Sequence, residues 1–226
     1  MRQAAALLPA RLGPTSPSRR AEQLLDELEE IFLSEGFHHL SIAELATRLR
    51  TSRRTFYELA PSRDELVLVV LDRIFHRMGR QAHDQMAGIV DPLDRVEVFL
   101  SSALPEMRRM SERFSDDLDR QPSAQRLFAE HIRYGTAVVG DMVQEAIDGG
   151  RAHPFDAYFV SQMLDAMYER VYAVTYRRGS TLTAEESLRE VTRFFRAALE
   201  IPEKSAGRRS EVLRSVTPKP NRRAAR

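Results

Sequence analysis

The 226-residue sequence contains no cysteine. This absence excludes disulfide bonds, thiol redox switches, cysteine nucleophiles and zinc sites built from thiolates. No apolar run approaches the roughly 18 residues that a membrane-spanning helix needs. The apolar patch within residues 1–13 is broken by Pro9 and lacks the length of a signal peptide, so we expect a cytoplasmic protein.

Sequence motifs of catalysis are missing as well. There is no glycine-rich phosphate loop, no Gly-x-Ser-x-Gly elbow and no His-Glu-x-x-His pair. The acid pair Asp116-Asp117 lies in a polar stretch and is expected to be solvated. His76 and His83 could share one helix face, but we expect no metal there. We therefore predict that the protein is not an enzyme and uses no cofactor or metal ion.

The sequence has no large excess of positive or negative charge, because it contains 34 basic and 33 acidic residues and its net charge is +1. Any affinity for nucleic acid must therefore come from a local patch. Such a patch lies between Ser41 and Arg63, where two glutamates accompany five arginines, at positions 48, 50, 53, 54 and 63.

The same stretch carries the pattern of two short helices. Ser41 and Glu44 have the spacing of a capping box, so a helix is predicted to begin at Ile42. Its apolar residues recur with helical spacing at Ile42, Leu45, Ala46 and Leu49. Ser52 can cap a second helix over residues 53–59. Two short helices joined by a tight turn form a helix-turn-helix, whose second helix can enter the DNA major groove.

Arg53 and Arg54 fall in the first turn of this second helix. A cation there opposes the helix dipole, so folding alone gives no reason for the two arginines. A phosphate or a guanine would give one.

The motif residues resemble the TetR family of transcriptional regulators. The resemblance runs without a gap from Arg20 to about Phe75, roughly a quarter of the chain. The matching residues are Ser41, Ile42, Glu44, Leu45 and Ala46, then Ser52, Thr55, Phe56 and Tyr57, then Ser62, Arg63 and Leu66. It implies an all-α homodimer that binds DNA and responds to a small-molecule effector.

The sequence departs from the family pattern in three places. Arg50 stands where the family usually has glycine in the turn, so it is predicted to adopt a positive φ at a cost of roughly 1 kcal/mol. Thr51 replaces the usual valine, and Leu59-Ala60 replaces His-Phe after the second helix.

The rest of the chain is predicted to be helical, since no segment alternates like a strand. Helices are expected over residues 19–35 and from residue 63 to about 86. A single helix kinked at Pro105 is expected over residues 93–107, followed at 114–122 by an irregular stretch or one short turn. Further helices are expected from Ser123 to about 148, from 155 to about 178 and from Thr183 to about 199.

We predict an all-α fold with an N-terminal three-helix helix-turn-helix DNA-binding domain and a C-terminal helical bundle for ligand binding and dimerisation. The predicted ranges are a disordered arm at 1–18, the DNA-binding domain at 19–63, the bundle at 64–201 and a basic disordered tail at 202–226. The arm is either a solvated leader or a DNA contact through Arg11, Arg19 and Arg20. The tail either keeps the protein soluble or adds non-specific DNA affinity.

The predicted function is a transcriptional regulator, expected to be a repressor, that binds a palindromic double-stranded DNA operator as a homodimer. We expect release by a small apolar or aromatic effector and no membrane partner. The predicted DNA contacts are Ser41, Ser52, Arg53, Arg54, Thr55, Tyr57 and Arg63. The predicted ligand contacts are aromatic and methionine side chains that could line one cavity: Phe99, Met107, Phe128, Met142, Phe159, Met163 and Tyr172.

Two alternatives stay open at this point. The C-terminal half could serve dimerisation alone, in a helical DNA-binding protein without a ligand. The chain could instead be a helical enzyme or adaptor in which the helix-turn-helix is inert.

Overall fold

The computed structural model describes residues 18–177 and 182–201. The predicted arm before Ser18 and the predicted basic tail at 202–226 lie outside the described residues. Ten α-helices occupy the described part, whose only strand-like feature is one antiparallel bridge between Ala152 and Glu200. The helices are α1 (Arg19–Glu35), α2 (Ile42–Arg48), α3 (Arg53–Leu59), α4 (Arg63–Met86), α5 (Pro92–Ser101), α6 (Leu104–Arg109), α7 (Glu112–Arg120), α8 (Pro122–Asp148), α9 (Ala157–Arg177) and α10 (Ala184–Leu199). The predicted all-α class is confirmed.

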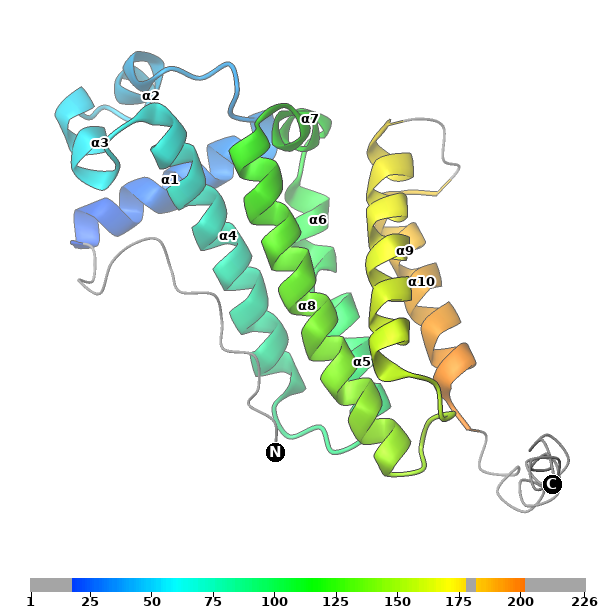
Figure 1. Cartoon of the computed structure of the whole chain (residues 1–226). Helices are drawn as coiled ribbons and strands as arrows, with labels where there is room; N and C mark the ends of the chain where they lie inside the picture. Colours follow the sequence, from blue (N-terminus) through cyan, green and yellow to red (C-terminus); the bar gives the residue numbers. More distant parts are fainter. Residues whose placement is uncertain (1–17, 178–181, 202–226) are drawn as a thin grey trace, which may run out of the picture.

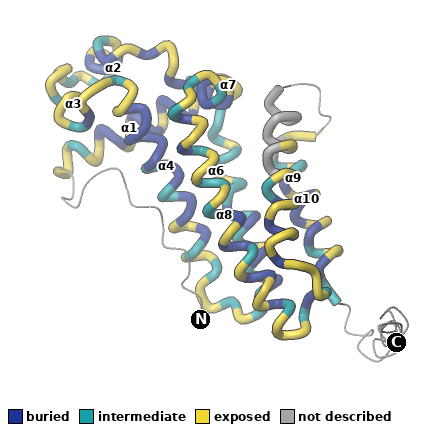
Figure 2. Tube along the Cα trace, viewed as in Figure 1, coloured by how far each residue is buried: buried dark blue, intermediate teal, exposed yellow. Residues whose placement is uncertain are grey.

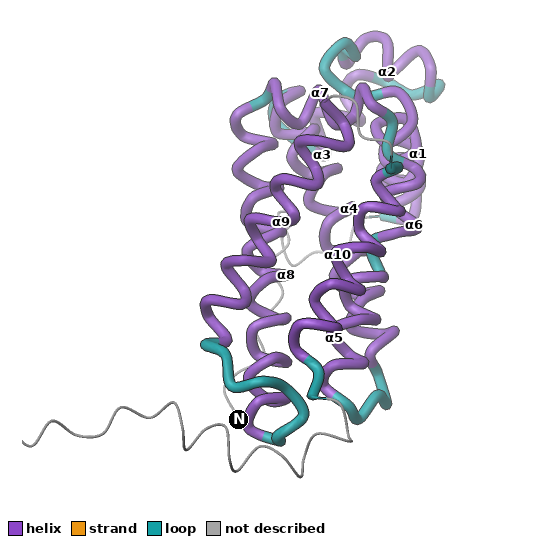
Figure 3. Tube along the Cα trace, turned by 90° about the vertical axis from the view of Figure 1, so that its right-hand side faces the viewer, coloured by secondary structure: helices purple, strands orange, loops and turns teal. Residues whose placement is uncertain are grey.

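Helices α1 to α3 gather at one end of the molecule, and α4 runs from them along the rest of it (Figure 1). Helix α8 runs in the same direction and packs against α4, whereas α9 returns in the opposite direction beside α8 (Figures 1 and 3). Helix α4 is therefore the element that leads directly from the helix-turn-helix into the bundle. Among the described helices, none combines the length and the apolarity needed to cross a membrane.

The buried side chains form two cores. The first joins α1, α2, α3 and α4 and continues into α7 and the start of α8 through Phe114, Leu118 and Leu127. The second joins α5, the later part of α8, α9 and α10. The core beneath the helix-turn-helix thus extends well beyond the sequence predicted for a DNA-binding domain, and the boundary at residues 63 and 64 stays a prediction.

Two expectations for the middle of the chain are wrong. The stretch expected to be irregular is helix α7, because Ser111 caps it and Phe114 and Leu118, one turn apart, are both buried. The single kinked helix over 93–107 is instead α5 and α6, separated by Ser102 and Ala103. Pro105 stands in the first turn of α6, where a missing backbone N–H costs no hydrogen bond.

The expectation that Asp117 is solvated is also wrong. Its side chain is buried, and Oδ2 accepts hydrogen bonds from the backbone amides of Phe37 (2.7 Å) and His38 (2.8 Å). These amides belong to the loop between α1 and α2, whose first residue, Gly36, has a φ of 79°. A Cβ on Gly36 would lie 2.5 Å from Asp117 Oδ2, so glycine is needed for both backbone conformation and space. One carboxylate thus fastens the helix-turn-helix loop to α7.

Replacing Asp117 with alanine should therefore destabilise the fold. The change would leave the backbone amides of Phe37 and His38 without an acceptor. This loss should lower the free energy of unfolding by about 2–3 kcal/mol. The free energy of unfolding in urea measures the effect. Asp116→Ala is the matched control, since Asp116 is exposed on the same helix and should change stability by less than about 0.5 kcal/mol. Equal effects of the two substitutions would contradict the assignment.

Candidate nucleic-acid interface

The turn between α2 and α3 is closed by two backbone hydrogen bonds. The amide of Arg50 donates to Thr47 O (3.3 Å), and the amide of Thr51 donates to Ala46 O (3.0 Å). This pair is a Schellman motif, in which the residue after the C-cap takes a left-handed conformation and is usually glycine. Here that residue is Arg50, with a φ of 48°, so the positive φ predicted from the sequence is confirmed.

Both short helices begin as their capping residues predict. Ser41 and Glu44 form the complete capping box, with Ser41 N to Glu44 Oε2 at 2.8 Å and Glu44 N to Ser41 Oγ at 3.2 Å. Ser52 Oγ accepts from the amide of Thr55 at 3.2 Å. Phe56 is the buried residue of α3, so most of this helix faces outward (Figure 2).

The predicted base-reading arginines lie on this outward side. Arg53 and Arg54 are both exposed. Arg54 Nε makes an ion pair with Glu58 at 3.1 Å, and its side chain remains 88% accessible. Exposed pairs of this kind contribute little, so they do not prevent a side chain from exchanging its partner. Tyr57 is also exposed, at 55% of its surface.

The hydroxyl groups at the start of α3 form a small cluster. Thr51 Oγ1 donates to Thr55 Oγ1 (3.2 Å), which also lies 2.9 Å from Ser52 Oγ. Ser52 is exposed and Thr55 is partly exposed, so both can be reached by a molecule that binds the outward side of α3. The structure thus places Arg53, Arg54, Thr55 and Tyr57 on α3 and Ser52 at its N-cap, and their DNA contacts stay predictions.

Arg63 has a structural role that sequence reasoning missed. Nε donates to Leu40 O (2.8 Å), and Nη2 donates to Phe37 O (2.6 Å) and His38 O (2.7 Å). Nη1 pairs with the neighbouring Asp64. Nε and Nη2 therefore hold the loop before α2 onto the start of α4. The predicted phosphate contact of Arg63 would have to share the guanidinium with these carbonyls.

Arg48 is also engaged within the fold. Its guanidinium meets the carboxylate of Glu35 on α1 through both terminal nitrogens, with Nη1 to Oε2 at 2.7 Å. The hydrogen bonds from Arg48 lower the pKa of Glu35, so the carboxylate stays charged.

A buried ionic network adds a second link between α1 and the bundle. Glu29 on α1 is buried and contacts Arg73 and Arg77 of α4, with Arg73 Nε at 2.7 Å. Arg77 also reaches Glu106 of α6 at 3.2 Å, and Arg109 binds Glu106 at 2.8 Å. A buried carboxylate requires such partners, because an unpaired buried charge is strongly destabilising. Helices α1, α4 and α6 are therefore tied together by charge as well as by apolar packing.

The structure does not bring the seven predicted ligand residues together. Met142 is buried in the second core, whereas Phe99, Met107 and Phe128 are partly buried. Phe159 and Met163 are exposed at 60% and 46%, on the outer side of α9. The side chain of Tyr172 lies outside the described residues. Helical periodicity identified apolar positions but could not say which core, or which outer face, each would join.

Aromatic side chains between α4, α5 and α8 form a row that we call the aromatic row. Phe75 is stacked on His131, with ring centroids 4.9 Å apart, and packs against Phe128 at 5.6 Å. Further along, His83 Nε2 lies 2.7 Å from Tyr134 Oη, and the His83 ring is 6.5 Å from Phe99. Its members are Phe75 and His83 of α4, Phe99 of α5, and Phe128, His131 and Tyr134 of α8. The row includes two of the predicted ligand residues, Phe99 and Phe128.

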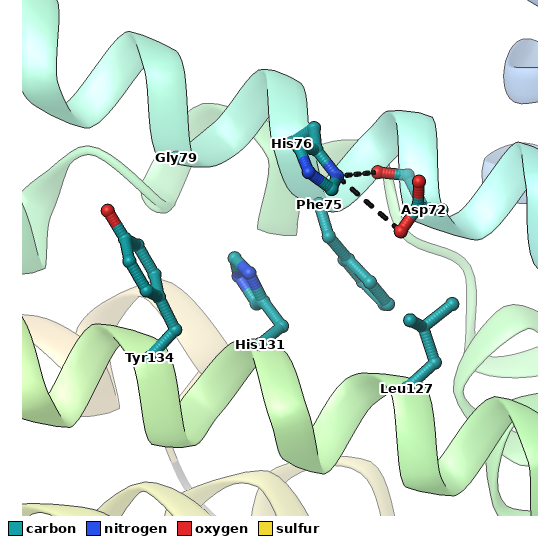
Figure 4. Close-up of a pocket in the computed structure, with 7 residues that line it drawn as sticks. All are labelled: Asp72, Phe75, His76, Gly79, Leu127, His131 and Tyr134. Atoms are coloured by element: carbon teal, nitrogen blue, oxygen red, sulfur yellow. Dashed lines mark hydrogen bonds and ion pairs between the residues drawn. The ribbon is translucent and has the colours of Figure 1, made fainter. Parts of the chain in front are cut away.

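A small pocket opens onto this row (Figure 4). Figure 4 shows His131 and Tyr134 reaching from α8 towards α4, where His76 lies beside Asp72. The pocket leaves only about 20 Å³ of free space, which is enough for one water molecule. Its lining residues are Asp72, Phe75, His76, Gly79, Leu127, His131 and Tyr134. Within the described ranges, no group of three or more acidic or histidine side chains is arranged to hold a metal ion.

Comparison with known proteins gives a family match in the region of the helix-turn-helix. Residues 24–70 match the model of bacterial regulatory proteins of the tetR family. An uncharacterized HTH-type transcriptional regulator from Mycobacterium tuberculosis is 28% identical over 88 residues, which are 39% of this chain and 44% of that protein. The match thus spans less than half the length of the curated relative.

Solved structures are similar over most of the chain. A transcriptional regulator from Saccharomonospora viridis, in complex with choline, has a TM-score of 0.69 at 14% identity, covering 82% of this chain and all of that one. A TetR/AcrR-family regulator from Thermobifida fusca has a TM-score of 0.59 at 19% identity, covering 78% of this chain and 96% of that one. At these identities the similarity concerns the fold.

The His131 side chain should make stability depend on pH. Burial, and secondarily the nearby His76, lower its pKa from 6.5 to about 4. Between these two pH values the unfolded chain binds a proton that the folded chain excludes, so the free energy of unfolding should fall as the pH drops from about 6.5 to about 4. His131→Phe keeps a ring against Phe75 and removes the titration, so the variant should lose less stability over this range. Denaturation curves across the range measure the difference. Parallel profiles of the wild type and the variant would contradict the prediction.

Proposed function

We propose that the chain is a member of the TetR family of bacterial regulatory proteins, whose model matches residues 24–70, and that it binds an operator in double-stranded DNA through α3 and regulates transcription. The observation that supports this best is the exposed side of α3, which carries arginine, hydroxyl and tyrosine side chains beyond its single buried Phe56. Arginine can bind guanine through two hydrogen bonds, and hydroxyl groups can bind phosphates. The proteins that the chain matches are transcriptional regulators rather than enzymes.

Selecting bound fragments from genomic DNA tests the proposal and identifies the operator. Alanine at both Arg53 and Arg54 should then weaken operator binding and relax its sequence preference, since each guanine contact is worth about 1–3 kcal/mol of discrimination. Fluorescence anisotropy with operator and scrambled duplexes measures both effects. Unchanged affinity and preference would contradict the role of these arginines. Failure of the wild-type protein to select any fragment would contradict the function and favour an inert helix-turn-helix.

We also propose that the protein acts as a homodimer through α9 and α10. Helix α9 exposes Tyr158 (74%), Phe159 (60%) and Met163 (46%), and α10 exposes Phe194 (61%). Large apolar side chains exposed together on neighbouring helices are typical of an interaction surface. A second copy related by a two-fold axis would cover them and make a four-helix interface. The same symmetry would require a palindromic operator.

Phe159→Asp should turn the dimer into a monomer, because it would place a charge inside the proposed interface. The side chain is largely exposed in one copy, so the substitution should leave the fold intact. Light scattering measures the mass, and operator affinity should fall because one protomer reads only one half-site. Val90→Asp is the matched control, since Val90 is 89% exposed in the loop after α4. A wild-type monomer at micromolar concentration would overturn the proposal.

The effector is proposed to enter between α4 and α8, at the aromatic row. The pocket there holds about 20 Å³, so any compound larger than water must move the two helices apart. Such a movement would shift α4, which begins four residues after α3 ends. It would also displace Arg73 and Arg77, which hold α1 through Glu29. Effector binding would therefore change the positions of α1 and α4, the two helices that support α2 and α3.

This switch predicts reciprocal coupling between effector and operator. A coupling of about 1–3 kcal/mol would reduce operator affinity 5- to 150-fold, and operator DNA would weaken effector binding by the same factor. Compounds can be screened by thermal shift, beginning with flat aromatic molecules and with choline, which one similar structure contains. Calorimetry with and without operator measures the factor. Equal effector affinity in both titrations would contradict the switch, and a screen without any binder would favour a regulator without a ligand.

A further inference from the structure

The helix-turn-helix has fewer available cations than its sequence implies. Arg48 is bound to Glu35, and Arg63 is bound to the carbonyls of the loop before α2. Arg54 has an exposed partner in Glu58. Arg50 is exposed, and the described part of the chain offers its side chain neither an ion pair nor a hydrogen bond. The turn between the two helices therefore carries an exposed cation that no other described residue binds.

The backbone conformation of Arg50 lowers the stability of the fold. Arg50 is the sole residue other than glycine with a positive φ in the described ranges, at 48°. A side chain in this conformation is strained, and glycine would adopt it more readily. Backbone strain of this kind is retained where the surrounding structure or the function of the protein requires that residue. Folding supplies one candidate reason, because a cation after α2 faces the negative end of that helix. The measured stability of a glycine variant can test that reason directly.

We propose that Arg50 binds a DNA phosphate at the edge of the groove that α3 enters, an inference that rests on the proposed DNA-binding function. Arg50 lies in the turn, two residues before the Ser52 cap, whereas base-reading residues lie on α3 itself. The turn precedes the inserted helix, and phosphates flank the groove on both sides. A flexible cation there can reach a phosphate whatever the base sequence. Arg50 thus lowers the stability of the fold and raises the affinity of the protein for DNA.

The experiment compares three substitutions at one position. Arg50→Gly removes both the charge and the strain, Arg50→Ala removes the charge alone, and Arg50→Lys keeps the charge. Arg80→Ala is the matched control, because it removes one exposed arginine roughly 25 Å along α4 from the DNA end. The probes are the genomic fragment selected by the wild-type protein and a random-sequence duplex of the same length, each titrated across a range of salt concentrations.

We expect Arg50→Gly to raise the melting temperature and yet to weaken binding to both duplexes by a similar factor, roughly 5- to 50-fold at about 0.1 M salt. The slope of log affinity against log salt should become shallower by about 0.9 per protomer. Arg50→Ala should bind as weakly as Arg50→Gly, whereas Arg50→Lys and Arg80→Ala should bind like the wild type.

Wild-type affinity in Arg50→Gly would overturn this inference while leaving the proposed function intact. A loss confined to the selected fragment would also overturn it, since that pattern belongs to a base contact. A lower melting temperature in Arg50→Gly would show that the arginine stabilises α2, and would remove the reason for assigning it to DNA. Failure of the wild-type protein to bind either duplex would overturn the proposed function and this inference together.

Discussion

The buried carboxylates of Glu29 and Asp117 hold the helix-turn-helix in place on the bundle. Asp117 of α7 accepts two amide hydrogen bonds from the loop after α1, and Glu29 of α1 is bound by Arg73 and Arg77 of α4. Charges removed from water must find such partners, and the partners must keep their positions as long as the charge is buried. The orientation of α2 and α3 therefore depends on polar contacts to α4 and α7 as much as on the apolar core that surrounds them.

For the proposed switch, this arrangement adds routes by which effector binding in the bundle could affect the helix-turn-helix. In the order of the helices along the chain, only α4 follows α3 directly and so connects the helix-turn-helix to the bundle. The structure adds contacts from α6 and α7, through the pairs that join Glu106 to Arg77 and Asp117 to the loop after α1. Parting α4 from α8 would strain these contacts together. In the proposed switch, a displacement at the aromatic row would therefore act on several supports of the helix-turn-helix at once.

The arginines illustrate how one residue type serves different needs in a short segment. Arg48 and Arg63 each bond more than one acceptor of the chain itself, Arg48 at the surface through both oxygens of Glu35 and Arg63 through loop carbonyls. Arg53 and Arg50 remain exposed, one on α3 and one in the turn. Arginine suits both roles because its planar group presents five donors and stays charged. The arginines without a partner among the described residues, Arg50 and Arg53, lie on the surface that the proposed function assigns to DNA.

What the sequence by itself determined was the local structure. The capping box at Ser41, the cap at Ser52 and the positive φ of Arg50 are all as predicted. Each depends on residues three to five apart, whose contacts follow from helix geometry. Tertiary structure alone decided that Asp117 would be buried, because its partner Phe37 lies 80 residues away. It likewise assigned Arg63 to three carbonyls and divided the predicted ligand residues between interior and surface. Periodicity shows that a residue is apolar, but the packing of distant helices decides what that residue touches.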